Sequence, residues 1–522
     1  MWYNTSMKKI TISQAEYDEL LAQKQASLLQ QKQIKEMQTQ LDWLLEQLRL
    51  SKHKQYGRSS EQDRDFNQLS FFDEAEAYAD PGEAEPSIQT IKAHTRKRKT
   101  GFKEQLPDDC PVEVIDYTLD DPHCPTCASA YETIGMDVRE TIKIVPATVS
   151  IVREQAHRYV CRCCEAQTDA ATIVEAPMPP ALLARSIASA ETVAHVMTQK
   201  FQLHLPLYRQ AQDWVSRGIP ISRQTMSNWL LACSQRYIKP LIDVMHKRLC
   251  QTTVLHADET TIQVLREPEK DAAQKSYMWL YRTGIHEPAP LVIYDYQPDR
   301  RQKRPETFLR DFNGYLHVDG YVGYKALPDG ITLVGCWAHA RRKFEEACRV
   351  QPSKHRKTSL AYEGQRRCDA LFGLEGNAKD LDDQARYQLR QTKAKPLVDA
   401  FFSWLKSLDA VGKTLFGQAV TYCLNQEQAL RRYLDDGRLE ISNNLAERSI
   451  KPFVIGRKNF LFANTPKGAD ASAWIFSLVE TAKANAINPY DYLCWVLKHA
   501  PALDLETYPE RAAGLLPECY PR

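Results

Sequence analysis

The alternation of apolar and polar residues between residues 252 and 350 predicts an α/β domain. Residues 252–265 (TTVLHADETTIQVL), 277–284 (YMWLYRTG) and 291–297 (LVIYDYQ) have the patterns of strands, with a short helix expected over 305–312 (PETFLRDF). A fourth strand ends at Asp319 in GYLHVDGYVGY, and residues 331–350 run from a strand into a helix. Three strands, a helix, a strand and a further strand with helices is the order of a ribonuclease-H-like domain.

Two aspartates stand out in this pattern. In a ribonuclease-H-like sheet the first and fourth strands are neighbours, so Asp258 and Asp319 are expected side by side. Asp258 interrupts an apolar strand, where a carboxylate is costly unless it binds a cation or faces a cleft. Gly320 lets the backbone turn away after Asp319. Acidic residues after strands are also common in loops, so the pair alone leaves both interpretations open.

Two other acids are weaker candidates for the same site. Glu259 alternates to the opposite face of the strand from Asp258. Asp295 lies in the third strand and is the nearest rival for a site carboxylate.

Glu447 lies in ISNNLAERSIKPFVIGRKNF, among Arg448, Lys451, Arg457 and Lys458. One interpretation is a helix start, in which Asn444 caps and Glu447 is the acidic member of a capping box. The other makes Glu447 a partner of the two aspartates. The polar, helix-prone stretch from about Ser353 to Asp436 is expected to be a helical insertion before this helix.

Residues 205–232 have the outline of a helix-turn-helix. Leu207, Gln210, Ala211 and Trp214 would line one face of a first helix, and Gly218 permits the turn. A second helix, capped by Ser222, would bury Met226, Trp229 and Leu230 and present four polar side chains suited to phosphates or base edges: Arg223, Gln224, Ser227 and Asn228. A plain structural hairpin has the same pattern.

Upstream, the chain is helical and then strongly charged. Five apolar residues recur at steps of three and four in a stretch free of proline and glycine, either as a short coiled-coil seam or as a plain amphipathic helix: Ile34, Met37, Leu41, Leu44 and Leu48. Nine acidic residues between Glu61 and Glu85 precede the basic HTRKRKTGFK, a composition typical of a flexible linker, with contact between the basic block and a DNA backbone as the alternative.

The cysteines follow a metal-site spacing. Cys124 and Cys127 (CPTC) and then Cys161 and Cys164 (CRCC) form two CxxC pairs, the pattern of a tetrahedral structural zinc site, with Cys163 as an ambiguous spare. Buried or redox-active thiols are the alternative.

Composition narrows the setting. Lys plus Arg number 68 against 66 for Asp plus Glu, a formal net charge of +2. Because the overall charge is close to zero, a polyanionic partner would have to be bound by local basic patches. With no signal peptide or apolar stretch of membrane-spanning length, a cytoplasmic protein with no membrane partner is expected.

Taken together, LHADETTIQVL, VDGYVGY, CWAHARRKF and NNLAERSIKPFVIGRKNFLFA resemble the insertion-sequence-66 type of transposase. The CxxC pairs, LPLYRQ and KQYGRSSEQ match that family in the same order, from about residue 15 to about residue 500. The resemblance implies a ribonuclease-H-like DDE domain whose triad is Asp258, Asp319 and Glu447. Cys336 and His339 resemble a CxxH signature of such families, with a structural or DNA-positioning role favoured over zinc binding.

The chemistry implied is strand cleavage and transfer of double-stranded DNA with two Mg²⁺ ions, or Mn²⁺, held by the three carboxylates. Asp258 is assigned to both ions by analogy with the fold. Six cations are candidates for phosphate contacts, with a solvated basic face as the alternative: Arg341, Arg342, Lys343, Arg448, Arg457 and Lys458. A homo-oligomer is expected, and accessory proteins of the same element are implied by the resemblance. A non-transposing nuclease and a catalytically silent DNA-binding regulator remain as alternatives.

The expected division of the chain follows from these patterns. It consists of an N-terminal helix (13–58), a charged linker (59–105), a zinc-binding domain (107–170), a helical helix-turn-helix-like region (180–250), the catalytic domain (251–350 and 437–500) with its helical insertion (351–436), and a C-terminal tail (501–522).

Overall fold

The computed structural model of the chain describes residues 149–161, 172–324, 327–352, 354–408 and 413–521, with scattered positions between 13 and 37. The chain divides into two compact units, Gly57–Pro177 and the remainder, and each is considered by itself. In the first unit, the described residues include a two-stranded antiparallel sheet of β1 (Arg158–Cys161) and β2 (Thr172–Glu175).

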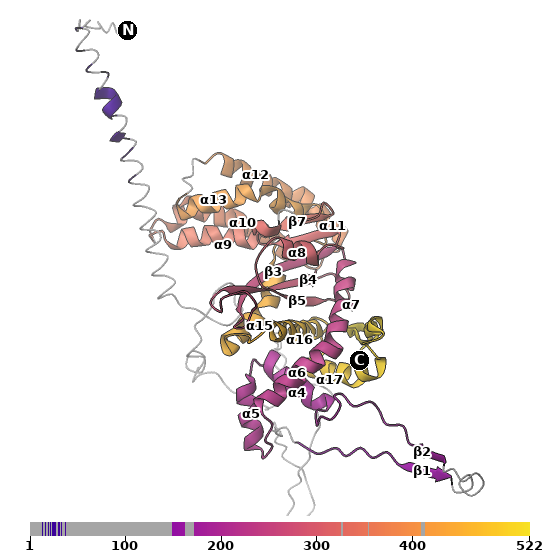
Figure 1. Ribbon diagram of the computed structural model, residues 1–522. Helices are drawn as coiled ribbons and strands as arrows, with labels where there is room; N and C mark the ends of the chain where they lie inside the picture. Colours follow the sequence, from indigo (N-terminus) through magenta and orange to yellow (C-terminus); the bar gives the residue numbers. More distant parts are fainter. Residues whose placement is uncertain are drawn as a thin grey trace, which may run out of the picture. The chain divides into compact units, whose positions relative to one another are not determined.

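A five-stranded mixed sheet organises the second unit (Figure 1). Its spatial order is β5-β4-β3-β6-β7. The central β3 pairs antiparallel with β4 and parallel with β6, and β7 continues the parallel half. The strands are β3 (Val254–Gln263), β4 (Lys275–Thr283), β5 (Val292–Gln297), β6 (Gly314–Val318) and β7 (Ile331–Gly335). The predicted strands are therefore confirmed, including the adjacency of the first and the fourth.

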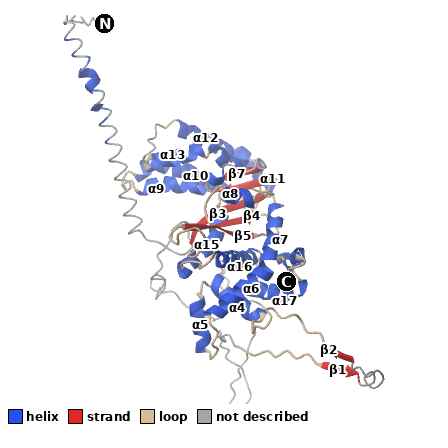
Figure 2. Cartoon of the chain, in the orientation of Figure 1, coloured by secondary structure: helices blue, strands red, loops and turns tan. Residues whose placement is uncertain are grey.

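Two helices late in the chain cover one face of the sheet (Figure 2). They are α15 (Asn444–Phe460) and α16 (Pro466–Ala484). On β5, the backbone N–H groups of Val292 and Tyr294 donate to hydroxyl groups of Thr481 and Ser477 on α16. Because side chains alternate along strands, the even-numbered residues of β3, Asp258 among them, share the face that α15 covers.

The predicted insertion is helical. It packs on α9 (Trp337–Arg349), which follows β7 directly. An aromatic core joins Trp337 and Phe344 of α9 to Phe401 and Phe402. Its main helices are α10 (Leu360–Asn377), α11 (Asp383–Leu389), α12 (Lys395–Lys406), α13 (Leu415–Asn425) and α14 (Glu427–Arg431).

The helical hairpin predicted before the sheet is also present. α5 (Leu207–Ser216) buries Leu207, Gln210 and Trp214, and α6 (Arg223–Cys233) buries Met226, Trp229 and Leu230. Gly218 has φ of +80°, and the Ser222 side chain accepts from the Thr225 N–H, so the predicted turn and cap are confirmed. α4 (Ala190–Phe201) packs on both helices of the hairpin. The other helices of this unit are α7 (Lys239–Cys250), α8 (Lys303–Phe308) and α17 (Pro489–His499).

Two predictions fall largely or wholly outside the described residues. Of the expected seam, only Met37 is described, and it is exposed. Of the four zinc-site cysteines, only the backbone of Cys161 is described, in β1. In the part of the chain that the structure does describe, no helix combines the length and the apolar character that crossing a membrane requires.

Candidate active site

Asp258 and Asp319 occupy equivalent places on adjacent parallel strands. In the β3–β6 register His256 pairs with His317, and each aspartate follows two residues later. β6 ends at Val318, so Asp319 stands just beyond the strand, where its Oδ1 accepts the Tyr321 N–H at 2.9 Å. Gly320 has φ of +96°, which is the backbone turn expected there. The two carboxylates therefore meet at one end of the parallel pair.

The third carboxylate, Glu447, comes from α15, which packs across β3 and β4. The capping-box interpretation of Glu447 is wrong. The helix is capped by Asn443 rather than by Asn444, and the cap has no side-chain hydrogen bond. The Asn443 side chain instead donates to the carbonyl of Ala257. Glu447 is thus free of the local role that its position in the sequence suggested.

The side chain of Glu447 is held by α9. Arg342 donates to Oε2 at 3.0 Å, and His339 Nδ1 lies 3.5 Å from Oε1. Among the described residues, Oε1 is buried and has no hydrogen-bond partner. Cys336, His339 and Glu447 bring their ligand atoms within 4.8 Å of one another. Burial raises the pKa of the Cys336 thiol to about 11, and its sulfur accepts the Asn443 N–H.

The electrostatics show that the three carboxylates interact. Burial raises the pKa of Asp258 well above its usual value, and the charges of Glu259, Asp319 and Glu447 raise it further. Like charges crowded in a partly buried place are stabilised by a bound cation. The crowding, the oxygen donor set and the unpartnered Oε1 of Glu447 fit a hard divalent metal such as Mg²⁺.

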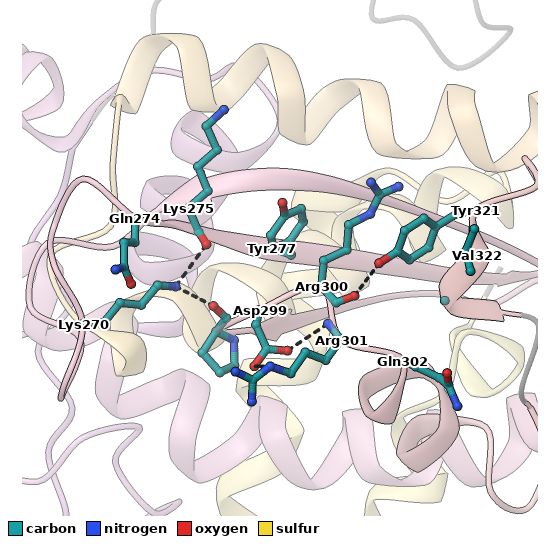
Figure 3. A pocket seen from close by; sticks show the side chains of 12 residues that line it. Lys270, Gln274, Lys275, Tyr277, Asp299, Arg300, Arg301, Gln302, Tyr321 and Val322 are labelled. Carbon is teal, nitrogen blue, oxygen red and sulfur yellow. Dashed lines mark hydrogen bonds and ion pairs between the residues drawn. The ribbon is translucent and has the colours of Figure 1, made fainter.

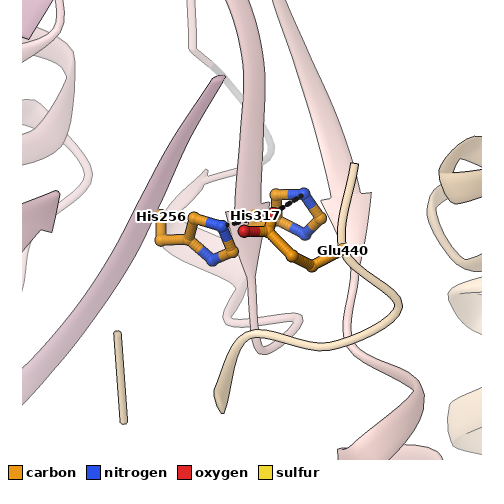
Figure 4. Close-up of side chains that lie close together, drawn as sticks. All are labelled: His256, His317 and Glu440. Atoms are coloured by element: carbon orange, nitrogen blue, oxygen red, sulfur yellow. Dashed lines mark hydrogen bonds and ion pairs between the residues drawn. The ribbon is translucent and has the colours of Figure 1, made fainter. Parts of the chain in front are cut away.

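His256, His317 and Glu440 form a second polar layer (Figure 4), and the two histidines stand two residues before Asp258 and Asp319 on the same strands. The rings of His256 and His317 stack with centroids 4.2 Å apart and planes 6° apart. Glu440 Oε2 accepts from His256 Nε2 at 2.8 Å, and its Oε1 accepts the Ile285 N–H. The ligand atoms of His256, His317 and Glu440 lie within 4.8 Å of one another, but the two rings lie in separate parallel planes, which is an unfavourable geometry for two histidine ligands of one ion. The hydrogen bonds of His256 to Glu440 and Asn443 join β3 to the segment that leads into α15.

The hydrogen bonds of this layer converge on His256. Asn443 gives its amide N–H to Ala257, so its Oδ1 faces His256 Nδ1. Both ring nitrogens of His256 therefore lie within hydrogen-bond distance of side-chain oxygens, 2.9 Å from Asn443 Oδ1 and 2.8 Å from Glu440 Oε2. Burial would raise the pKa of Glu440, but His256 and His317 lower it well below its usual value.

Sequence reasoning missed this layer, although a signal was present. The strands read LHAD at 255–258 and LHVD at 316–319, so the same His-x-Asp spacing recurs on both strands. Residues two apart on a strand share a face, so each histidine had to lie beneath its aspartate. Glu440 and Asn443 carry no comparable signal.

The rival acids lie on the other side of the sheet. Glu259 is in register with Trp279, which is in register with Asp295, so both acids face away from Asp258. Glu259 accepts from Arg300 and from the Tyr324 hydroxyl. Burial raises the pKa of Asp295 to about 7, and it accepts from Gln297. Neither acid shares the face of Asp258.

The predicted DNA-contacting cations differ in their surroundings. Arg341 is paired with Asp369 and Glu345, and Arg342 with Glu447. Lys343 lies over the Tyr422 ring, 4.9 Å from its centroid. Arg457 donates to Thr260 and Thr261 of β3, while Arg448 and Lys458 are exposed on α15. On α6, Arg223, Gln224 and Asn228 are exposed and Ser227 is half-buried.

Comparison with known proteins identifies the family. Residues 185–471 match the model of the IS66 transposase family, and residues 477–517 match the IS66 C-terminal element. Residues 121–165 match the zinc-finger binding domain of transposase IS66, and residues 43–115 match a domain described as transposase C of IS166 homeodomain.

Full-length relatives agree with these matches. The uncharacterized protein y4qI of Sinorhizobium fredii is 30% identical over 472 residues, covering 86% of this chain and 84% of its own. The uncharacterized protein y4hP of the same organism is 29% identical over 437 residues, covering 79% and 76%. The family model spans more than half of the chain and the site described above, and on this evidence the protein belongs to the IS66 family of transposases.

Proposed function

We propose that this transposase is a DDE enzyme that binds the ends of a mobile element and catalyses metal-dependent DNA strand cleavage and strand transfer. The observation that carries the proposal is the placement of Asp258 and Asp319 at one level on adjacent parallel strands, with the Glu447 helix packed on β3. The sheet order β5-β4-β3-β6-β7 supports a ribonuclease-H-like catalytic domain.

Asp258, Asp319 and Glu447 would hold the divalent ions, two Mg²⁺ or Mn²⁺. Such ions supply Lewis-acid activation of the attacking and leaving oxygens in phosphoryl transfer. The protein contributes the position and the charge of the ligands. The His256–Glu440 pair ties β3 to the segment that leads into the Glu447 helix, and Arg342 holds the Glu447 carboxylate through Oε2, with His339 beside Oε1.

DNA contacts are assigned to two surfaces. The exposed residues Arg223, Gln224 and Asn228 on α6, with Ser227 beside them, suit the grooves or backbone of a duplex. Arg448 and Lys458 on the Glu447 helix suit phosphates close to the reacting bond, with Arg342, Lys343 and Arg457 nearer the carboxylates. Arg341 is less suited, because Asp369 and Glu345 already neutralise it.

A structural zinc ion on Cys124, Cys127, Cys161 and Cys164 is part of the proposal, supported by the match to the family's zinc-finger domain. Self-association through the N-terminal helix is also proposed, since two element ends must be held together for transfer. Partners are double-stranded DNA and further copies of this chain.

The experiment combines purified protein, labelled element ends and a target duplex, with Mg²⁺ or with EDTA. The proposal predicts nicking at the ends and joined products in Mg²⁺ alone. Cleavage without joining would identify a nuclease. Specific binding without cleavage in Mg²⁺ or Mn²⁺ would identify a regulator, and either result would contradict the proposal.

A further inference from the structure

A pocket of about 600 Å³ lies against the start of β4 and the turn that follows Asp319 (Figure 3). It is lined by residues of β4, of the segment after β5 and of the turn after β6, and its volume falls within the range of ligand pockets. The proposal below uses five side chains of this lining: Lys275, Tyr277, Arg300, Arg301 and Tyr321.

Two charged residues of the pocket are already used within the protein. The Lys270 ammonium group donates three hydrogen bonds, to the carbonyl of Lys275, to the Ser276 hydroxyl and to the carbonyl of Pro298. Asp299 accepts from Arg304 at 2.9 Å. Arg304 thereby neutralises Asp299, the acid of the pocket lining. Lys270 connects the start of β4 to the segment after β5.

The remaining charge at the rim is positive. The Arg301 side chain is 84% exposed, and its ion pair with Asp299 is a long one, with 3.9 Å between the Arg301 Nε and Asp299 Oδ2 atoms. Lys275 is exposed, and Arg300 shares its charge with Glu259. An anionic group entering the pocket therefore meets cations on more than one side.

The pocket also presents aromatic surface. Tyr277 and Tyr321 are half-buried, and the Arg300 guanidinium lies 3.6 Å from the centroid of the Tyr321 ring. Tyr321 is fixed there because its hydroxyl donates to the carbonyl of Arg300 at 2.7 Å. Gly323 is needed beneath it, since a Cβ at that position would collide with the Tyr321 ring. Flat rings and a stacked guanidinium are the groups on which unpaired bases stack.

The chain connects this pocket to the carboxylates over two short paths. Tyr321 lies two residues after Asp319, and its N–H donates to that carboxylate. Arg300 holds Glu259, the residue after Asp258. The charge of Arg300 also interacts with that of Asp319, so the pocket lies at the same end of β3 as the two aspartates, on the face of the sheet that carries Glu259. A DNA strand that runs over this end of β3 from Asp319 reaches the pocket by way of Tyr321.

We propose that this pocket binds an unpaired nucleotide of the DNA substrate, stacking its base on the Tyr277, Tyr321 and Arg300 surface and contacting its phosphate through Arg301 and Lys275. The inference rests on the proposed function for the identity of the substrate. It adds that the enzyme binds duplex DNA with locally opened strands better than fully paired DNA.

The test compares a blunt duplex with the same duplex carrying a short single-stranded thymidine extension, in EDTA, by fluorescence anisotropy. The extension should tighten binding by about tenfold in the parent protein. Tyr277→Ala and Arg301→Ala should each lose most of that gain, and Tyr277→Phe should keep it. Arg366→Ala, which removes an exposed arginine of α10, is the matched control and should keep the gain.

No gain from the extension in the parent, or an unchanged gain in the Tyr277→Ala/Arg301→Ala protein, would overturn the proposal. Because Arg301 is on the surface, its variant stays informative if Tyr277→Ala melts early. Free thymidine monophosphate should compete with the extension and abolish the gain in affinity at a lower concentration than inorganic phosphate does. Equal competition by the two would also overturn the proposal, because it would show a phosphate site without base stacking. Binding in EDTA requires no cleavage, so the pocket and the proposed activity can fail separately.

Discussion

Arg342 on α9 donates a hydrogen bond of 3.0 Å to the Glu447 carboxylate on α15, across 105 residues of sequence. The insertion helices lie between these two elements in the chain, and they pack on α9. The helical insertion therefore contributes to the geometry of the site. In the sequence it separates the strands of Asp258 and Asp319 from the helix of Glu447, so the position of Glu447 depends on how α9 and α15 are held together.

Replacing Asp258 by asparagine should separate metal binding from folding. Because the raised pKa of Asp258 means that its charge opposes folding at neutral pH, Asp258→Asn should stabilise the metal-free protein. Mg²⁺ at a hundredfold excess over its Kd should stabilise the parent by about 2.7 kcal/mol and the variant far less. Thermal melting with and without Mg²⁺ measures both effects. Glu259→Gln should keep the parent's Mg²⁺ response, and an equal response in Asp258→Asn would remove Asp258 from the ligand set.

Asp295 should make stability fall as pH rises. Its folded pKa of about 7 is above the unfolded value, so the folded state holds the extra proton and loses stability between about pH 4 and pH 7. A shift of this size corresponds to at most about 4 kcal/mol. Denaturant unfolding across this range should give a flatter profile for Asp295→Asn than for the parent. The exposed Asp271→Asn is the control, and an unchanged slope in Asp295→Asn would show that Asp295 is ionised throughout.

Local sequence patterns predicted much of the fold, but they did not predict the contacts of Asn443 and Glu440 with the sheet beside the site. The strands were predictable because their apolar residues alternate, and the two aspartates because a carboxylate in such a strand is costly. The capping prediction failed because Asn443 bonds to the sheet, a contact 186 residues away in sequence. Glu440 could not be found for the same reason, since its partner His256 lies 184 residues earlier.

Arg390 should hold the segment that leads to Glu447. Its buried guanidinium pairs with Glu375 and donates to the carbonyls of Tyr433, Asp436 and Leu439, just before Glu440. Arg390→Gln should lower the free energy of unfolding by about 3–5 kcal/mol, because it leaves the Glu375 carboxylate without its partner. Hydrogen exchange should rise in 433–440, and cleavage should fall more than DNA binding. Normal exchange there would restrict Arg390 to a role within the insertion, and Arg366→Gln should change neither property.

The zinc site should be separable from the catalytic domain. Metal analysis of unchelated protein should give about one Zn²⁺ per chain, and Cys161→Ser should lose it, because structural zinc is coupled to local folding. The five-stranded sheet belongs to the other unit and should melt as in the parent. Cys519→Ser, at an exposed cysteine outside the CxxC pairs, should retain the metal. Protein purified without any zinc would contradict the site.

The most direct test of the account is strand cleavage and transfer by Glu447→Gln in Mg²⁺. No capping bond depends on this side chain, so the variant should fold with near-parental stability. An amide is a much poorer Mg²⁺ ligand than a carboxylate, so both reactions should fall by orders of magnitude while DNA binding is retained. Cleavage and joining at close to the parental rate would contradict the assignment of Glu447 to the site, and with it the proposed triad.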